Sequence, residues 1–143
     1  MYKRQLARAL GADEVVPYRE RDVVAAVREW SAGEGVDAVI DPVGGETLAA
    51  SLESLRPRGV VVNLGLAGGA TSTIPHLYPL FRNERRLVGS WMGSMAELRF
   101  GLELVRAGRI RAALDRVLPL EDARVVHEQV ADGRIVGKVV LRP

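Results

Sequence analysis

The chain has 143 residues, of which 48% are hydrophobic and 27% charged, so it can bury a core of ordinary size but is at most one domain. This composition excludes a disordered chain, and no apolar run reaches the roughly 18 residues of a membrane-spanning helix. The net charge is +2 with the charges scattered, which gives no basic stripe for nucleic acid. The absence of cysteine excludes disulfides and thiolate metal ligands, and with an amino end that lacks a signal peptide it favours the cytoplasm.

Short β-branched runs alternate with helical patterns along the first half of the chain. This alternation is typical of a parallel sheet whose strands are joined by crossover helices. The expected elements are a helix ending near Leu10, a strand over 14–18, a helix capped by Asp22 and ending before Gly33, a strand over 36–41, a helix from 46 to about 55, and an apolar strand over 59–65.

The second half begins with a loop rich in Gly, Ala, Ser and Thr, over 66–73. Regular patterns return after it. They predict a short helix or turn over 75–81, a strand over 86–91, a helix over 95–107, a helix over 120–131 and a strand over 137–141.

Several short segments stand in a characteristic order along this pattern. They are Leu10-Gly11-Ala12-Asp13, Tyr18-Arg19-Glu20, Gly35-Val36-Asp37, Asp41-Pro42-Val43-Gly44-Gly45, Leu64-Gly65, Gly89-Ser90-Trp91, Asp115-Arg116-Val117 and the run from Gly137 to Pro143. In this order and spacing the chain resembles the carboxy-terminal half of medium-chain dehydrogenases/reductases, in the quinone oxidoreductase-like branch of the zinc-binding dehydrogenase family.

The resemblance implies an α/β fold class, a partial Rossmann-like, doubly wound parallel sheet with flanking helices. Family members carry a GroES-like catalytic domain and a Gly-rich phosphate turn first, and this chain contains no G-x-G-x-x-G. Residues 1–143 are therefore interpreted as a partial dinucleotide-binding domain without its first strands, with 1–5 as a candidate junction. In the strand order 3-2-1-4-5-6, the absent strands 1 and 2 leave a gap between the strands ending at Tyr18 and Asp41. The final strand, 136–142, is expected to return to the missing catalytic domain.

Ligands of open parallel sheets lie beyond the carboxyl ends of the strands, which makes the residues that follow each predicted strand the candidates for a binding site. Glycine there lets the backbone approach a flat cofactor ring, but it also makes tight turns, and the sequence leaves both interpretations open. The candidate cofactor-binding residues are Lys3, Tyr18, Val43, Gly44, Leu64, Gly65 and Leu66.

The resemblance implies NADPH as the cofactor, without excluding NADH. Relatives place a tyrosine and a lysine beside the adenosine 2′-phosphate, at the positions of Tyr18 and Lys3. A phenol and an ammonium suit a dianionic phosphate, and Arg19 is an alternative partner for it. The alternative for Tyr18 is a strand-end residue with a half-buried ring.

The sequence identifies no catalytic residue and no metal ligand, so no zinc is expected in this segment. Acidic pairs such as Glu121-Asp122 lie at helix starts or in loops, where carboxylates stabilise the helix dipole. His76 and His127 are interpreted as structural residues. Asp41 either contacts a ribose hydroxyl or holds the loop that follows it.

The leading interpretation is a fragment of an NADPH-dependent oxidoreductase that transfers a hydride to a quinone or an α,β-unsaturated carbonyl. The alternatives are an enoyl reductase module of the polyketide synthase type and a non-catalytic nucleotide-binding module. The resemblance also implies a homodimer through the strand over 86–91 at the sheet edge, and Trp91 fits a covered edge. The partners expected are a small-molecule substrate, with no nucleic acid and no membrane, and the chain alone is expected to be inactive.

Overall fold

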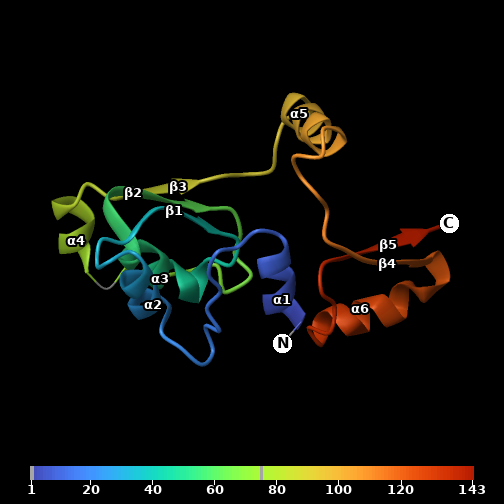
Figure 1. The fold of residues 1–143 in the computed structure, drawn as a ribbon, viewed down its shortest axis with the longest axis horizontal. Helices are drawn as coiled ribbons and strands as arrows, with labels where there is room; N and C mark the ends of the chain where they lie inside the picture. The colour runs from blue at the N-terminus through green and yellow to red at the C-terminus, as the bar shows by residue number, and fades with distance from the viewer. Residues whose placement is uncertain (1, 75) are drawn as a thin grey trace. The chain divides into compact units, whose positions relative to one another are not determined.

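The computed structural model describes residues 2–74 and 76–143, which form two compact units (Figure 1). The central unit comprises residues 16–92, and the terminal unit comprises the residues up to Val15 together with 93–143. Each unit contains parallel strands accompanied by helices, which confirms the expected α/β class.

The central unit is built around a three-stranded sheet. Its elements are α2 (Val23–Trp30), β1 (Val36–Asp41), the 3₁₀ helix η1 (Gly45–Thr47), α3 (Leu48–Glu53), β2 (Leu55–Asn63), α4 (Leu77–Arg82) and β3 (Arg86–Gly89). The strand order is β1-β2-β3, and both neighbouring pairs are parallel. Helices α2 and α3 lie on the same side of β1 and β2 in Figure 1.

The predictions of the strand β1 and the helix α2 are confirmed. Both elements could be predicted because local signals determine them. The Asp22 side chain caps α2 by accepting a hydrogen bond from the Ala25 amide at 2.8 Å. The helix then buries Ala26 and Val27, while Trp30 is exposed. β1 has the predicted bounds, and its free edge makes it one margin of the described sheet.

The core of the central unit lies between α3 and the middle strand. Leu55 and Val61 of β2 are fully buried, and Leu52 of α3 packs with them. These residues are covered because β2 has a strand on each side and α3 over one face. Partly buried hydrophobic residues surround this cluster, namely Val36, Val39, Leu48, Ile74 and Leu80.

The predicted helix from 46 to about 55 is shorter than expected, and the following strand is longer. The helical residues are divided between η1 and α3, and α3 ends at Glu53. Leu55, near which the predicted helix was expected to end, instead opens β2 and pairs with Val36 of β1. Pro57 cannot continue a helix, and an irregularity in the β1–β2 register accommodates the residues before Gly59.

The prediction of a strand over 14–18 is wrong. Residues 14–17 have no regular structure, and a turn begins at Tyr18. The Pro17 carbonyl accepts hydrogen bonds from the amides of Glu20 at 2.8 Å and Arg21 at 3.0 Å, which closes this turn. Pro17 also lacks an amide hydrogen for a strand ladder, so the β-branched pair before it is not sufficient to make a strand.

The terminal unit contains a second pair of parallel strands. Its elements are α1 (Tyr2–Ala9), α5 (Met95–Arg106), β4 (Leu114–Pro119), the 3₁₀ helix η2 (Leu120–Asp122), α6 (Ala123–Ala131) and β5 (Lys138–Arg142). The sequence did not predict β4, because Asp115 and Arg116 interrupt its apolar pattern. The predictions of α5, α6 and β5 are confirmed to within a few residues. Pro75, where a short helix was predicted to begin, lies outside the described residues.

Candidate functional site

The three strands of the central unit end at one edge of their sheet. Asp41 of β1 pairs in register with Asn63 of β2, and Asn63 pairs with Gly89 of β3. The chain leaves β1 through the first glycine loop (residues 42–45) and leaves β2 through the second glycine loop (residues 64–69). The edge that these two loops form is the place where open parallel sheets bind ligands.

The Asp41 carboxylate is buried at the start of the first glycine loop, with 3% of the residue exposed. Its Oδ1 atom accepts hydrogen bonds from the amides of Val43 at 3.0 Å and Gly44 at 2.9 Å. The Thr47 hydroxyl lies 2.9 Å from both carboxylate oxygens, and the Ser51 hydroxyl donates to Oδ2 at 2.9 Å. Of the two roles open for Asp41, the structure therefore supports the one that holds the loop.

This environment keeps Asp41 ionised at neutral pH. Burial raises the pKa of its carboxyl, but the hydrogen bonds from Gly44, Thr47, Val43 and Ser51 together outweigh burial and hold the pKa below its usual value. A buried carboxylate is stable when its lone pairs are satisfied in this way.

Asn63 connects the ends of the first two strands. Its Nδ2 atom donates to the Asp41 carbonyl at 3.3 Å and to the Gly65 carbonyl at 2.9 Å. The main-chain carbonyl of Asn63 accepts a hydrogen bond from the amide of Ser90, just beyond β3, at 2.9 Å. One residue thus links all three strand ends.

The two glycine loops lie against each other, backbone to backbone. A side chain at Gly44 would collide with the Gly65 carbonyl, and one at Gly65 would collide with the Pro42 carbonyl. At Gly68, a Cβ would lie only 2.7 Å from the Gly44 carbonyl oxygen. These glycines therefore serve a purpose that the sequence did not indicate, because they let the two loops approach each other.

The structure brings together five of the seven candidate cofactor residues. Val43 and Gly44 lie in the first glycine loop, and Leu64, Gly65 and Leu66 lie in the second. Leu64 and Leu66 are 47% and 63% exposed, which leaves apolar side chains at the edge, whereas Gly44 is buried.

Tyr18 and Lys3 belong to segments outside the two glycine loops. Tyr18 belongs to the central unit, is 69% exposed, and has the Arg19 guanidinium carbon 6.0 Å from the centre of its ring. It does not end a strand with a half-buried ring, which was its alternative interpretation. Lys3 is exposed on α1 in the terminal unit.

The sequence interpretation missed Thr47, Ser51 and Asn63. Thr47 and Ser51 are four residues apart, the spacing that places two side chains on one face of a helix, and this spacing after a strand-end aspartate was the available signal. Asn63 was treated only as part of an apolar strand, although it is the polar residue at the end of that strand.

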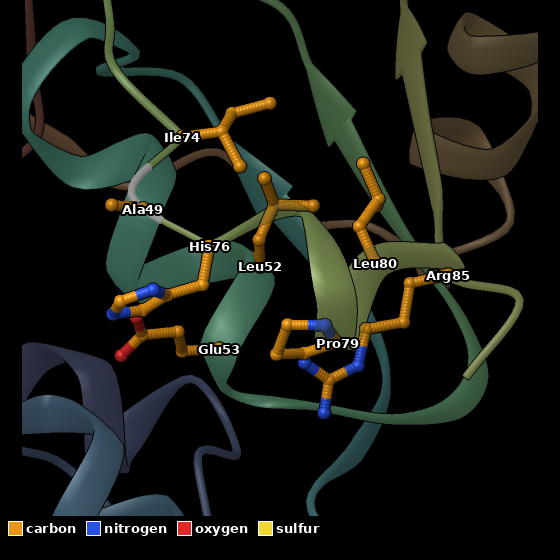
Figure 2. Close-up of a pocket in the computed structure, with 8 residues that line it drawn as sticks. All are labelled: Ala49, Leu52, Glu53, Ile74, His76, Pro79, Leu80 and Arg85. Carbon is orange, nitrogen blue, oxygen red and sulfur yellow. The ribbon is translucent and has the colours of Figure 1, made fainter. Parts of the chain in front are cut away.

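A small pocket lies elsewhere in the central unit, between α3 and α4 (Figure 2). Its residues are Ala49, Leu52, Glu53, Ile74, His76, Pro79, Leu80 and Arg85. The cavity volume of about 20 Å³ suits a water molecule and excludes a nucleotide. Arg85 donates to the Leu55 carbonyl at 2.5 Å, and His76 lies at the pocket wall.

Residues 2–74 and 76–143 contain no cluster of three or more His, Asp or Glu side chains arranged to hold a metal ion. Within the same residues, no helix is both long enough and apolar enough to cross a membrane.

Comparison with known proteins identifies the family. Residues 10–141 match the family described as zinc-binding dehydrogenase. This chain belongs to the zinc-binding dehydrogenase family. The resemblance to quinone oxidoreductase-like medium-chain dehydrogenases/reductases is thereby confirmed.

Two relatives illustrate the similarity in sequence. The chain is 31% identical to a 2-haloacrylate reductase of Burkholderia sp over 150 residues, which cover 99% of this chain and 45% of the relative. It is 32% identical to a quinone oxidoreductase of Pseudomonas aeruginosa, with 99% of this chain and 46% of the relative covered. The chain thus spans less than half the length of these relatives.

Solved structures agree with this assignment. The alcohol dehydrogenase of Aeropyrum pernix superposes with a TM-score of 0.85 at 30% identity, over 97% of this chain and 39% of that protein. A 2-haloacrylate reductase structure superposes with a TM-score of 0.80 at 30% identity, over 100% of this chain and 47% of that protein. The match is to the carboxy-terminal portion of Rossmann-type structures in this family.

We predict that Gly65→Ala will destabilise the central unit and separate the glycine loops. The added Cβ meets backbone atoms of Pro42, which cannot rotate away, so the free energy of unfolding should fall by about 1–3 kcal/mol. Urea denaturation measures this loss, and amide chemical shifts of the first glycine loop report the separation.

Gly89→Ala is the matched control for this variant. Gly89 also ends the sheet region, but an added Cβ there has no atom within 4 Å. Equal losses of stability in the two variants would show that the contact between the loops does not constrain Gly65.

Proposed function

We propose that this chain is the carboxy-terminal part of the cofactor domain of an NADPH-dependent oxidoreductase, which transfers a hydride to a quinone or an α,β-unsaturated carbonyl. The observation that carries the proposal is the pair of closely packed glycine loops at the carboxyl ends of parallel strands. Family membership supports the class of reaction, and the chain's relatives include quinone oxidoreductases and a 2-haloacrylate reductase.

The residues at this edge fit a dinucleotide. The Asp41 carboxylate is saturated by hydrogen bonds and buried, so it presents no exposed charge to a cofactor phosphate. Leu64 and Leu66 offer exposed apolar surface for a flat ring, and glycine backbone allows close approach. When bound, the cofactor supplies the hydride, and the protein supplies binding, orientation and exclusion of water.

Tyr18 is proposed to bind the 2′-phosphate of the cofactor, with Lys3 or Arg19 assisting. Tyr18 is well exposed, and the neighbouring Arg19 guanidinium adds positive charge near its ring. A phenol hydroxyl next to a cation is a suitable donor pair for a dianion. NADH remains the alternative cofactor, because some relatives are NAD-dependent alcohol dehydrogenases.

A homodimer through β3 is proposed for the parent protein. β3 is the last strand in the order β1-β2-β3, so one of its edges has no neighbour in the described sheet. All four residues of β3 are exposed, and Trp91 just beyond it is 86% exposed in the single chain. Pairing with the same strand of a second copy would satisfy the backbone groups and cover this apolar surface.

The parent protein should oxidise NADPH with a small quinone or an enone as acceptor. We would follow the loss of NADPH absorbance with a quinone, an enone and an enoyl thioester as acceptors. In the reverse direction, we would follow the formation of NADPH from the oxidised cofactor with a primary alcohol as substrate. Preference for the thioester would favour the enoyl reductase alternative, and turnover of the alcohol alone would favour an alcohol dehydrogenase. Cofactor binding without turnover of any substrate would contradict the proposal and favour a non-catalytic nucleotide-binding module.

Tyr18→Phe should weaken NADPH binding by the parent about tenfold and leave NADH binding unchanged, since it removes one hydrogen bond to a charged group. Calorimetric titration with both cofactors measures this difference. Tyr78→Phe, at another exposed tyrosine of the central unit, is the matched control. An equal loss for both cofactors would exclude a role of Tyr18 at the 2′-phosphate.

Val88→Lys should convert a dimeric parent to a monomer, because it places a charge in the apolar strand proposed to pair with its copy. Light scattering at micromolar concentration gives the mass, and Val125→Lys on α6 is the control at an exposed valine in the terminal unit. A monomeric unaltered parent, or a dimer unaffected by Val88→Lys, would contradict this interface.

A further inference from the structure

The Asp41 carboxylate fastens the first glycine loop to the helix that follows it. Two of its donors are the loop amides of Val43 and Gly44, and the other two are the hydroxyls of Thr47 in η1 and Ser51 in α3. The carboxylate therefore lies between the loop and the helical segment and holds each against the other.

The second glycine loop is in turn attached to the first. The Gly68 amide donates to the Val43 carbonyl at 2.8 Å, and the Ser72 hydroxyl donates to the Gly45 carbonyl at 2.7 Å. Gly65 fits against Gly44 and Pro42 with no space for a side chain. A displacement of the first loop must therefore displace the second.

We propose that Asp41 is a positioning residue that sets the cofactor-binding surface of both glycine loops without touching the cofactor. The inference rests on the proposed function. Direct contact is excluded by the burial of Asp41 and by its four donors, which occupy both carboxylate oxygens. Leu64 and Leu66, proposed to face the cofactor, are in the second loop, which the Asp41 carboxylate reaches through the first loop, while the Asp41 main-chain carbonyl accepts from the Leu64 amide at 3.0 Å.

The carboxylate supplies acceptors on both of its sides. Oδ1 accepts from two backbone amides, Oδ2 accepts from the Ser51 hydroxyl, and the Thr47 hydroxyl lies 2.9 Å from both oxygens, so both oxygens act as acceptors. In Asp41→Asn the side-chain nitrogen can face the hydroxyls only if these accept instead of donating, and the oxygen that faces the amides of Val43 and Gly44 is no longer charged. The shape is kept, but the hydrogen bonds from the loop amides weaken because their acceptor is neutral.

The experiment uses the 143-residue chain labelled with ¹⁵N and measures hydrogen exchange of individual amides. In Asp41→Asn we expect exchange at Gly44 and at Gly68 to accelerate at least tenfold relative to the amide of Val61 in the core. Gly44 reports the direct attachment, and Gly68 reports its transmission to the second loop. Thr47→Val should give a smaller acceleration at the same two amides, and Thr47→Ser, which keeps the hydroxyl, should restore the slow exchange.

Asp22→Ala is the matched control for general loss of stability. Asp22 also accepts a hydrogen bond from a backbone amide of the central unit, but it caps α2 and has no contact with the glycine loops. This variant should leave the exchange of Gly44 and Gly68 unchanged relative to Val61. Unchanged exchange at Gly68 in Asp41→Asn, or equal acceleration in Asp22→Ala, would overturn the inference.

A second measurement separates this inference from the proposed function. NADPH is added to each labelled chain, and shifts of the amides of Leu64 and Leu66 are followed to millimolar concentration. We expect Asp41→Asn to raise the apparent Kd at least fivefold, and Asp22→Ala to leave it unchanged. An Asp41→Asn chain that binds as tightly as the unaltered chain overturns the positioning role. Absence of shifts in the unaltered chain with NADPH and NADH counts against the proposed function, while the exchange ratio alone still decides whether Asp41 couples the loops.

Discussion

Parallel hydrogen bonding on both sides of β2 is the constraint on which the candidate site depends. Because β1, β2 and β3 run in the same direction, Asp41, Asn63 and Gly89 end level with one another at one edge. A reversed middle strand would place Asn63 at the opposite edge and separate the two glycine loops. The loops meet only because the sheet delivers both to the same place, which is the general reason why open parallel sheets bind ligands there.

The parts of the fold that could be predicted are those with local causes. β1 was predicted with its observed bounds because a short run with β-branched residues stands between Gly35 and Gly44, and α2 was predicted because Asp22 precedes a helical pattern. The structure of residues 14–18 and of Leu55 could not be predicted in this way. A strand was predicted over 14–18 from its apolar residues, but Pro17 closes a turn there. A helix was predicted as far as Leu55, but Leu55 pairs with Val36 and belongs to a strand. Strand formation depends on a partner far along the chain, which short-range patterns do not contain.

The same distinction applies to the candidate site. Its location followed from strand ends and glycines, and five of the seven candidate residues do lie together. The partners of Asp41 were not identified, because Thr47 and Ser51 act through the fold of η1 and α3 rather than through a motif. The contact of Gly44 with Gly65 joins residues about twenty positions apart, and nothing in either segment alone indicates it. The roles of Tyr18 and Lys3 at a 2′-phosphate stay predictions.

The backbone contact between the glycine loops divides this edge into positions that tolerate change and positions that do not. At Gly44 and Gly65 the nearest atoms belong to main chain, so no rearrangement of rotamers can make space for a larger residue. Leu64 and Leu66 are exposed, and substitutions there alter the surface while leaving the loop path intact. A library intended to change ligand preference should therefore randomise the two leucines and keep the glycines fixed, since shape at this edge is set by main chain and chemistry by the side chains that project from it.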